Sequence, residues 1–261
     1  MTRLPTLFVS HGSPMLALDS GATGRAWQMM GEQLPRPRAI VVVSAHWSTP
    51  TTAIGSGAQH NTIHDFYGFP AALYQLRYDA PGDPALAQKL FHVLNDADWP
   101  AQLDAGRGLD HGAWVPLKTM YPEANIPVVP VSINAHRDPS YHYRLGQLLR
   151  EAIGDDVLLL ASGSLTHNLY EFEPGRGNQP AAAYVREFQE WMFQRLQAAD
   201  LAALLNYRQQ APAAQRAHPT DEHLLPLYAA LGAADPALRA QRHLDIVTER
   251  ILAMDIYSFA A

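Results

Sequence analysis

Three apolar runs of strand length, each followed closely by a histidine, constrain the fold of this chain more than any other feature. They are "TLFVSH" at residues 6–11, "VVVSAH" at residues 41–46 and "VLLLASGSLTH" at residues 157–167. None alternates apolar with polar residues, which is the pattern of strands covered on both faces of a parallel sheet. Neighbouring strands of such a sheet would bring their histidines to one crevice at their carboxyl ends.

The expected strands and helices alternate along the chain. Strands are expected at residues 4–10, 39–45, 126–133 and 157–162. Helical periodicity, with capping residues at several starts, occurs at residues 23–34, 84–94, 113–121, 140–152 and 182–198. In the tail, "HLDIVTERILAMDIYSFA", branched and aromatic residues favour closing strands over a helix. The order predicts an α/β fold with a largely parallel central sheet flanked by helices, and an active site at the C-terminal ends of the strands.

The chain is expected to form a single catalytic domain over residues 1–261. It contains no internal repeat, low-complexity tract or long charged run. The stretches rich in proline and glycine, "APGDP" and "EPGRGNQP", are short enough to be loops.

Composition narrows the class of ligand. The chain has 19 Lys plus Arg against 25 Asp plus Glu and a net charge of -6, which argues against nucleic acid or an anionic membrane as a partner. With no cysteine, a disulfide framework and a thiolate site are excluded, so any metal must be held by histidine, carboxylate or water. No apolar run has the length of a signal peptide core or a membrane span. We expect a cytoplasmic protein that acts on a small molecule.

His11, His46 and His167 are the first candidate site residues because each follows an apolar run. The competing interpretation is that a histidine at a strand end merely caps backbone groups at the surface, but three together favour a site. Gly12 begins a sharp turn after His11, which allows the backbone to approach a ligand closely. Trp47 follows His46 and would offer an aromatic wall to a planar substrate.

A second group of candidates lies in "HPTDEHLLPL", residues 218–227. We expect residues 219–221 to start a helix, with Glu222 and His223 in its first turn, where either side chain can point into a cleft. The alternative is that Glu222 only complements the helix dipole while His223 is exposed to solvent. His218 is a weaker candidate and is expected in a loop.

Two further stretches carry histidines beside acidic residues. In "DHGAW", residues 110–114, Asp110 either orients the His111 imidazole or simply caps a helix. In "IHDFYGF", residues 63–69, His64 stands among an aspartate and three aromatic residues, in a loop that is either a lid over the site or a packed surface loop.

Taken in order, six motifs resemble those of the class III (LigB-type) extradiol ring-cleavage dioxygenase superfamily, and within it the DOPA 4,5-dioxygenase-like branch. They are "SHGSPM", "SAHW", "IHDFYGFP", "DHGAWVPL", "SGSLTHNL" and "HPTDEHLLPL", and they run from residue 4 to about residue 234. The resemblance implies an Fe(II) enzyme that opens a catechol ring next to its two hydroxyls and inserts both atoms of O2. The same resemblance implies that a catechol and O2 are the small molecules on which the protein acts.

The resemblance also implies roles for the site residues. His11, His46 and His223 look like the metal ligands, although Glu222 stays open as the third because the wider superfamily uses two histidines and a carboxylate. His167 looks like the acid/base over the metal, or a fourth ligand in a zinc-loaded form. Three neutral ligands would leave positions open for catechol and O2, and Fe(II) is expected for activity although imidazoles bind Zn(II) readily too.

The remaining candidates concern the substrate. His111 looks like a catalytic pocket residue that helps to bind or deprotonate the catechol, and the expected lining residues are Trp47, His64, Phe66 and Trp114. Two other functions stay open. A zinc hydrolase on the same cluster would need Glu222 or His167 as its general base, and a non-catalytic binding protein could use the same scaffold.

Overall fold

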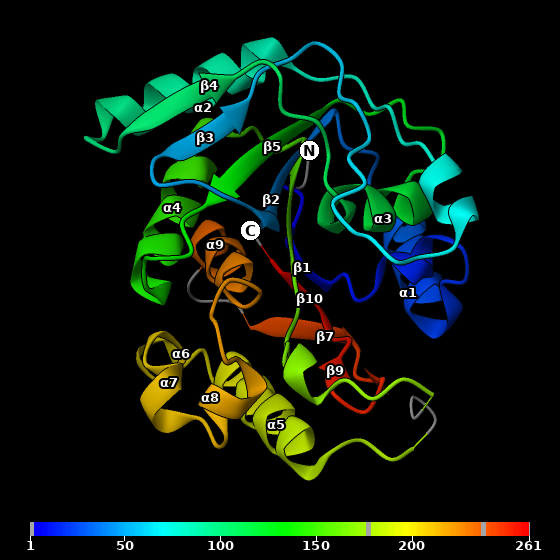
Figure 1. The fold of residues 1–261 in the computed structure, drawn as a ribbon. Coiled ribbons are helices and arrows are strands. Elements are labelled where there is room, and N and C mark those ends of the chain that lie inside the picture. The colour runs from blue at the N-terminus through cyan, green and yellow to red at the C-terminus, as the bar shows by residue number, and fades with distance from the viewer. Residues whose placement is uncertain (1–2, 176–178, 236–238, 261) are drawn as a thin grey trace.

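The computed structural model describes residues 3–175, 179–235 and 239–260. Its main sheet has eight strands in the order β4-β3-β5-β2-β6-β1-β10-β7 (Figure 1). These strands are β1 (Thr6–Ser10), β2 (Ala39–Ser48), β3 (Thr52–Gly55), β4 (Ala101–Asp104), β5 (Val128–Ile133), β6 (Val157–Gly163), β7 (Ala240–Leu244) and β10 (Ile256–Phe259). A separate pair consists of β8 (Val247–Thr248) and β9 (Leu252–Ala253).

Helices alternate with the strands through most of the chain. The α-helices are α1 (Gly21–Gln33), α2 (Pro84–Asp96), α3 (His111–Met120), α4 (Pro139–Ala152), α5 (Ala183–Gln197), α6 (Leu201–Leu205), α7 (Tyr207–Gln210), α8 (Ala214–Ala217) and α9 (Leu225–Ala233). Three 3-10 turns are η1 (Pro14–Ala17), η2 (Ala71–Gln75) and η3 (Leu169–Glu171). The prediction of an α/β fold with a largely parallel sheet is confirmed.

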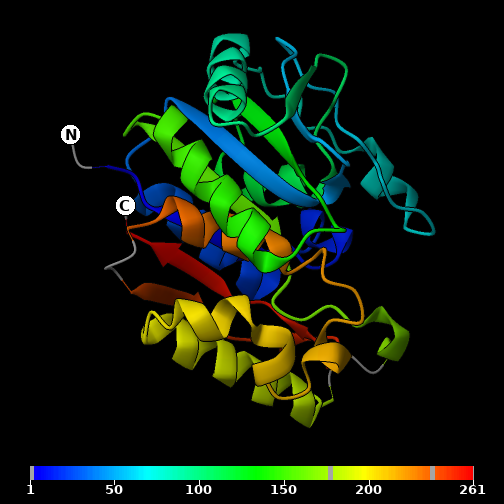
Figure 2. The same ribbon diagram turned by 90° about the vertical axis from the view of Figure 1, so that its left-hand side faces the viewer.

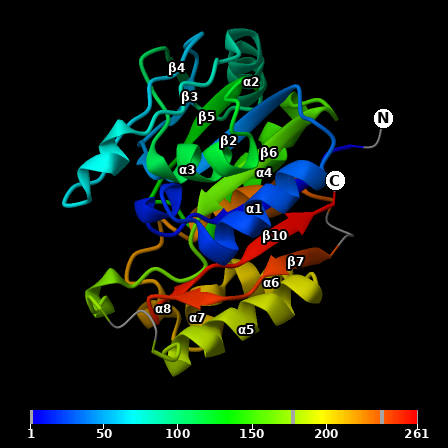
Figure 3. The same cartoon turned by 90° about the vertical axis from the view of Figure 1, so that its right-hand side faces the viewer.

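The central strands are buried on both faces, as their unbroken apolar runs predict. In β2, Val41 and Val43 belong to the core on one face of the sheet, whereas Ile40 and Val42 belong to the core on the other. Helices α2, α4 and α9 lie over the first face (Figure 2), and α1 and α3 lie over the second (Figure 3). Successive side chains of a strand point to opposite faces, so a strand covered on both sides must be apolar throughout.

Parallel pairing aligns the carboxyl ends of three strands. β6 pairs in parallel with β1, where Gly163 stands opposite Ser10, and with β2, where Ser162 stands opposite Ser44. The residues that follow these positions therefore begin at the same edge of the sheet. This register, rather than any local feature, places His11 beside the end of β2.

The C-terminal tail forms strands, as its composition suggests. β10 pairs antiparallel with β1, and β7 pairs antiparallel with β10. The tail thus extends the sheet beyond the parallel strands. The short strands β3 and β4 and the short helices α6 to α8 were not among the expected elements.

Two expected boundaries near the site are wrong. β2 continues to Ser48 through an irregular register, so His46 lies within the strand rather than after it. Helix α9 begins at Leu225, not at residues 219–221, because the carbonyl of His223 accepts the backbone N–H of Ser164 instead of an N–H of its own helix. None of the helices in the described part of the chain is long and apolar enough to cross a membrane.

Candidate active site

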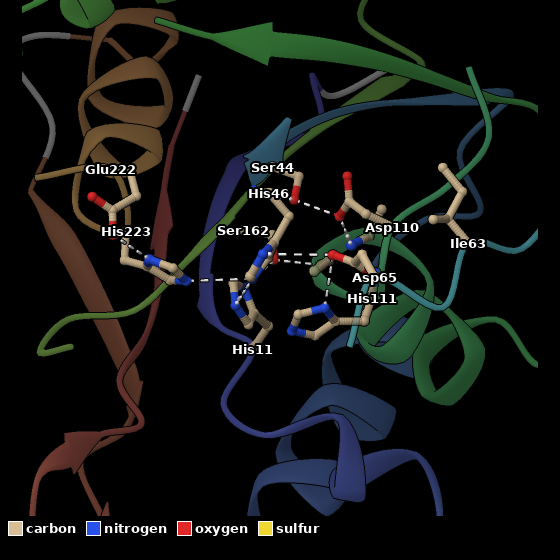
Figure 4. Close-up of polar contacts among 12 residues, drawn as sticks. His11, Ser44, His46, Ile63, Asp65, Asp110, His111, Ser162, Glu222 and His223 are labelled. Atoms are coloured by element: carbon tan, nitrogen blue, oxygen red, sulfur yellow. Dashed lines mark hydrogen bonds and ion pairs between the residues drawn. The ribbon is translucent and has the colours of Figure 1, made fainter. Parts of the chain in front are cut away.

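Three imidazoles converge at the carboxyl edge of the parallel strands (Figure 4). His11 follows β1, His46 lies near the end of β2, and His223 lies in the turn before α9. The Nε2 atom of His46 is 3.0 Å from that of His11 and 3.3 Å from that of His223. These three residues form a group that can hold a metal ion. Neutral imidazole nitrogens are common metal ligands.

The other ring nitrogen of each imidazole faces an oxygen atom. Nδ1 of His11 is 3.0 Å from the hydroxyl of Ser162, which itself donates to the carbonyl of Gly112 and therefore accepts from the ring. Nδ1 of His223 is 3.0 Å from Glu222 Oε1. An ionised carboxylate only accepts hydrogen bonds. The proton of each of these two rings consequently lies on Nδ1, which leaves its Nε2 lone pair free for a cation.

Asp65 lies against both His46 and His111, and it is hydrogen-bonded to His111. Its Oδ2 atom is 3.5 Å from Nδ1 of His46 and 3.0 Å from Nδ1 of His111, and its Oδ1 atom accepts the backbone N–H of His111 at 2.9 Å. Burial raises the pKa of Asp65, but hydrogen bonds from His111 outweigh it and bring the pKa to about 2. The side chain is therefore an ionised acceptor at neutral pH.

The histidines of this cluster are neutral at physiological pH. Burial, followed by the neighbouring imidazoles, lowers the pKa of His11 and of His223 well below 6.5. Burial and His111 lower the pKa of His46 to about 3. A metal ligand must be deprotonated, so these shifts keep all three nitrogens available across the physiological range.

Glu222 lies beside the cluster as a partner of His223. Its Oε1 atom accepts from His223 Nδ1 and, at 3.1 Å, from the hydroxyl of Thr220. Glu222 and His223 also form, with His167, a second group that can hold a metal ion. The hydrogen bond to His223 Nδ1 means that Glu222 contacts that ring directly, a contact that was not predicted from the sequence.

His167 lies flat against His223. The two ring centroids are 3.4 Å apart and the planes differ by 12°. In the described part of the chain neither ring nitrogen of His167 has a hydrogen-bond partner, so both are available to a bound molecule. The backbone N–H of His167 donates to the carbonyl of Ala217, which fixes the end of the "SGSLTH" loop against α8.

His111 completes the group of five imidazoles. Its ring centroid is 4.0 Å from that of His46 and 5.3 Å from that of His11. The residue that orients it is Asp65 and not the adjacent Asp110, which caps α3 through the N–H of Ala113. For Asp110 the helix-capping interpretation of the sequence is therefore the one observed. Sequence proximity favoured Asp110, and only the fold brings the Asp65 loop to α3.

Three of the four expected lining residues gather next to His111. The ring of Phe66 is 5.7 Å from that of His111 and 6.4 Å from that of Trp114, and His64 is 6.0 Å from Trp114. The indole N–H of Trp114 donates to the carbonyl of Ile63. The "IHDFYGF" loop is thus packed onto α3 at the site.

Trp47, the fourth expected lining residue, packs elsewhere. The guanidinium of Arg107 lies 4.8 Å from its ring centroid, and Arg107 in turn pairs with Asp110 at 2.6 Å. His218, the weaker candidate, is fully buried and bonds the carbonyl of Leu165 at 2.8 Å. Its place is in the support of the loop that carries His167.

Reasoning from the sequence alone missed the oxygen atoms that orient the rings. Ser162 and Asp65 lie within stretches that contain polar residues, but nothing near either residue in the sequence indicates which histidine it contacts. The same reasoning also missed Ser44, which contacts the backbone of His46 rather than its ring: its hydroxyl donates to Asp110 at 2.6 Å and accepts the backbone N–H of His46 at 3.2 Å. A serine two residues before the histidine that ends an apolar run is the sequence signal that points to Ser44.

Comparison with known proteins places these residues in context. A family model described as the catalytic LigB subunit of aromatic ring-opening dioxygenase matches residues 5–254. Proteins named 4,5-DOPA dioxygenase extradiol are 39% identical in Beta vulgaris, covering 90% of this chain and 89% of the relative, and 42% identical in Escherichia coli K12, covering 90% and 86%. A protein of the same name from Mirabilis jalapa is 34% identical and covers 97% of this chain and 96% of its own length.

Solved structures include one with the same fold over almost the whole chain. The crystal structure of an uncharacterized protein from Escherichia coli K12 has a TM-score of 0.84 and 34% sequence identity. The match covers 98% of this chain and 100% of that one.

Proposed function

Because the chain belongs to the family of catalytic LigB subunits of aromatic ring-opening dioxygenases and is an extradiol dioxygenase, we propose that it opens a DOPA-like catechol at an Fe(II) ion held by His11, His46 and His223. The observation that carries the ligand set is the convergence of the three Nε2 atoms. The names of the relatives support the substrate class. They favour the dioxygenase over the zinc hydrolase and the binding protein that the sequence left open.

The three proposed ligands fit a divalent metal. Their donor atoms are neutral nitrogens, each Nδ1 faces an oxygen atom, and three protein ligands leave further positions open. When bound, Fe(II) supplies a site that chelates both catechol oxygens and makes the reaction with O2 accessible. The same nitrogens suit Zn(II), which follows Fe(II) in the affinity order, so zinc is expected to compete for the site.

His111 and His167 are proposed to manage the protons. Nδ1 of His111 bonds Asp65, so its Nε2 atom has the lone pair that accepts the proton of a catechol hydroxyl. The ring of His167 stacks on that of His223. In the described part of the chain, neither ring nitrogen of His167 has a hydrogen-bond partner, so both can exchange a proton with a bound substrate. His167 is the proposed acid/base that returns a proton as the ring opens.

The aromatic group beside His111 is proposed to bind the substrate ring. Phe66 presents an apolar ring 5.7 Å from the His111 imidazole, and His64 and Trp114 pack behind it. Trp47 is proposed to contribute through its contact with Arg107 at the end of β2. Because the site residues extend from residue 11 to residue 223, residues 1–261 are proposed to act as one catalytic domain.

The test of this function is metal reconstitution. Metal-free protein is loaded anaerobically with Fe(II) or Zn(II), then mixed with DOPA and a panel of catechols while O2 uptake and the yellow ring-opened product are followed. We expect one O2 consumed per catechol with Fe(II) and none with Zn(II). Absence of O2 uptake in protein shown to hold Fe(II) would contradict the proposal.

Replacing His167 should separate chemistry from metal binding. We expect His167→Ala to keep its metal and to lower kcat by about 10²–10⁴-fold, the usual contribution of a general acid/base. His167→Phe is the matched control, because it keeps a flat ring stacked on His223 without a proton acceptor. Metal content is measured by elemental analysis beside the kinetics. Loss of metal from both variants would instead make His167 a ligand.

A further inference from the structure

One carboxylate serves two imidazoles of different proposed roles. Asp65 Oδ2 faces Nδ1 of His46, a proposed metal ligand, and Nδ1 of His111, the proposed acceptor of the substrate proton. The two rings lie 4.0 Å apart at an angle of 47°. We propose that Asp65 is a positioning residue that fixes the tautomer and the orientation of both rings together, an inference that rests on the proposed function for the roles of the two histidines.

Asp65 is held so that it can do this. Its Oδ1 atom accepts the backbone N–H of His111, so the carboxylate has a fixed position at the start of α3. The side chain is 21% exposed, and that of His111 is 7% exposed, so water competes little for the hydrogen bond between them. Nδ1 of His111 donates to Oδ2, and Nδ1 of His46 lies 3.5 Å from the same oxygen, whose negative charge favours a proton on that nitrogen. With the proton of each ring on Nδ1, both Nε2 lone pairs point away from Asp65.

The carboxylate of the neighbouring Asp110 is bonded to groups other than the imidazoles. Arg107 pairs with it at 2.6 Å, the hydroxyl of Ser44 donates to it, and it caps α3. The polar partners found for Asp65 in the described part of the chain are His46 and His111 alone. Of the two aspartates at the start of α3, only Asp65 thus has its charge directed to imidazoles.

The Asp65→Asn variant tests the role with almost no change of shape. If the amide oxygen keeps the backbone N–H of His111, the amide NH2 faces both ring nitrogens, which must then accept and move their protons to Nε2. If the amide turns over, its NH2 meets the backbone N–H and the loop loses its anchor. In the first arrangement, Nε2 of His46 carries a proton and can no longer bind the metal. In the second arrangement, the His111 ring loses its fixed position.

We expect the dissociation constant for Co(II) to rise about 10–100-fold in Asp65→Asn, the typical effect of removing a partner of a metal-binding histidine. The visible spectrum of any bound Co(II) should change, because ring orientation sets the ligand geometry. Asp79→Asn is the matched control. Asp79 anchors the same loop through Thr62 at 2.9 Å and pairs with Arg77, and in the described part of the chain it has no hydrogen bond or ion pair with the five imidazoles.

A second measurement does not depend on any variant. Long-range nitrogen NMR of histidine-labelled, metal-free wild-type protein reports which ring nitrogen carries the proton, and we expect Nδ1 for both His46 and His111. A proton on Nε2 of either ring, or wild-type Co(II) affinity and spectrum in Asp65→Asn, would overturn the proposal. Neither the Co(II) measurements nor the NMR spectra depend on turnover. A wild-type enzyme that binds Fe(II) and takes up no O2 would therefore contradict the proposed function. The role of Asp65 would still be decided by the Co(II) and NMR results.

Discussion

His223→Ala should lose its bound metal and its ring-cleaving activity, whereas Glu222→Gln should keep both at reduced strength. His223 Nε2 lies 3.3 Å from His46 Nε2, and alanine removes that donor atom completely. Glutamine retains an oxygen that can accept from His223 Nδ1, so the ring stays oriented. For Glu222→Gln we expect a loss of about 10–100-fold in metal affinity, and for His223→Ala a larger loss.

The measurement is metal content after dialysis against a weak chelator, followed by kcat/KM with DOPA. His92→Ala, on the exposed side of α2, is the control for replacing a histidine outside the site. The opposite ranking, with metal lost from Glu222→Gln and kept by His223→Ala, would make the carboxylate the third ligand. That result would also return the site to the two-histidine, one-carboxylate pattern of the wider superfamily.

Gly163→Ala should damage the site although it changes no polar group. A Cβ atom on Gly163 would lie 2.1 Å from the carbonyl oxygen of His223 and 3.3 Å from Pro226. The clashing atom belongs to the backbone, so the turn that carries His223 must move. The carbonyl of Gly163 also accepts the backbone N–H of His11, so the same change disturbs a second proposed ligand.

Overpacking of this kind costs roughly 1–3 kcal/mol of unfolding free energy, and we expect a lower Tm together with weaker metal binding. Gly106→Ala is the matched control, because the nearest atom to its Cβ would be Asp104 Oδ1 at 3.6 Å, an ordinary contact. Thermal unfolding and Co(II) titration of both variants measure the difference. Equal metal affinity in Gly163→Ala and wild type would show that the turn adjusts without moving the ligand.

Much of the fold follows from residues near one another in the sequence. The apolar runs at β1, β2, β5 and β6 are buried on both faces because hydrophobic burial depends on the side chain itself and on its spacing along the strand. The same reasoning anticipated the strands of the tail. Helix α9 begins later than the sequence predicts, because the carbonyl of His223 accepts the backbone N–H of Ser164, a residue far away in the sequence.

The sequence by itself determined that an α/β sheet would carry histidines at the carboxyl ends of its strands, and the motif order tied them to the dioxygenase family. The tertiary structure alone decided which distant oxygen lies against each ring: Ser162 against His11, and Asp65 against His46 and His111. Only Glu222, the partner of His223, is also its neighbour in the sequence. Periodicity reports whether a side chain is buried, whereas a hydrogen bond depends on distances of about 3 Å between residues that only strand register and loop packing bring together. Asp110, adjacent to His111 in the sequence, caps a helix, and Asp65, from a separate loop, holds the imidazole.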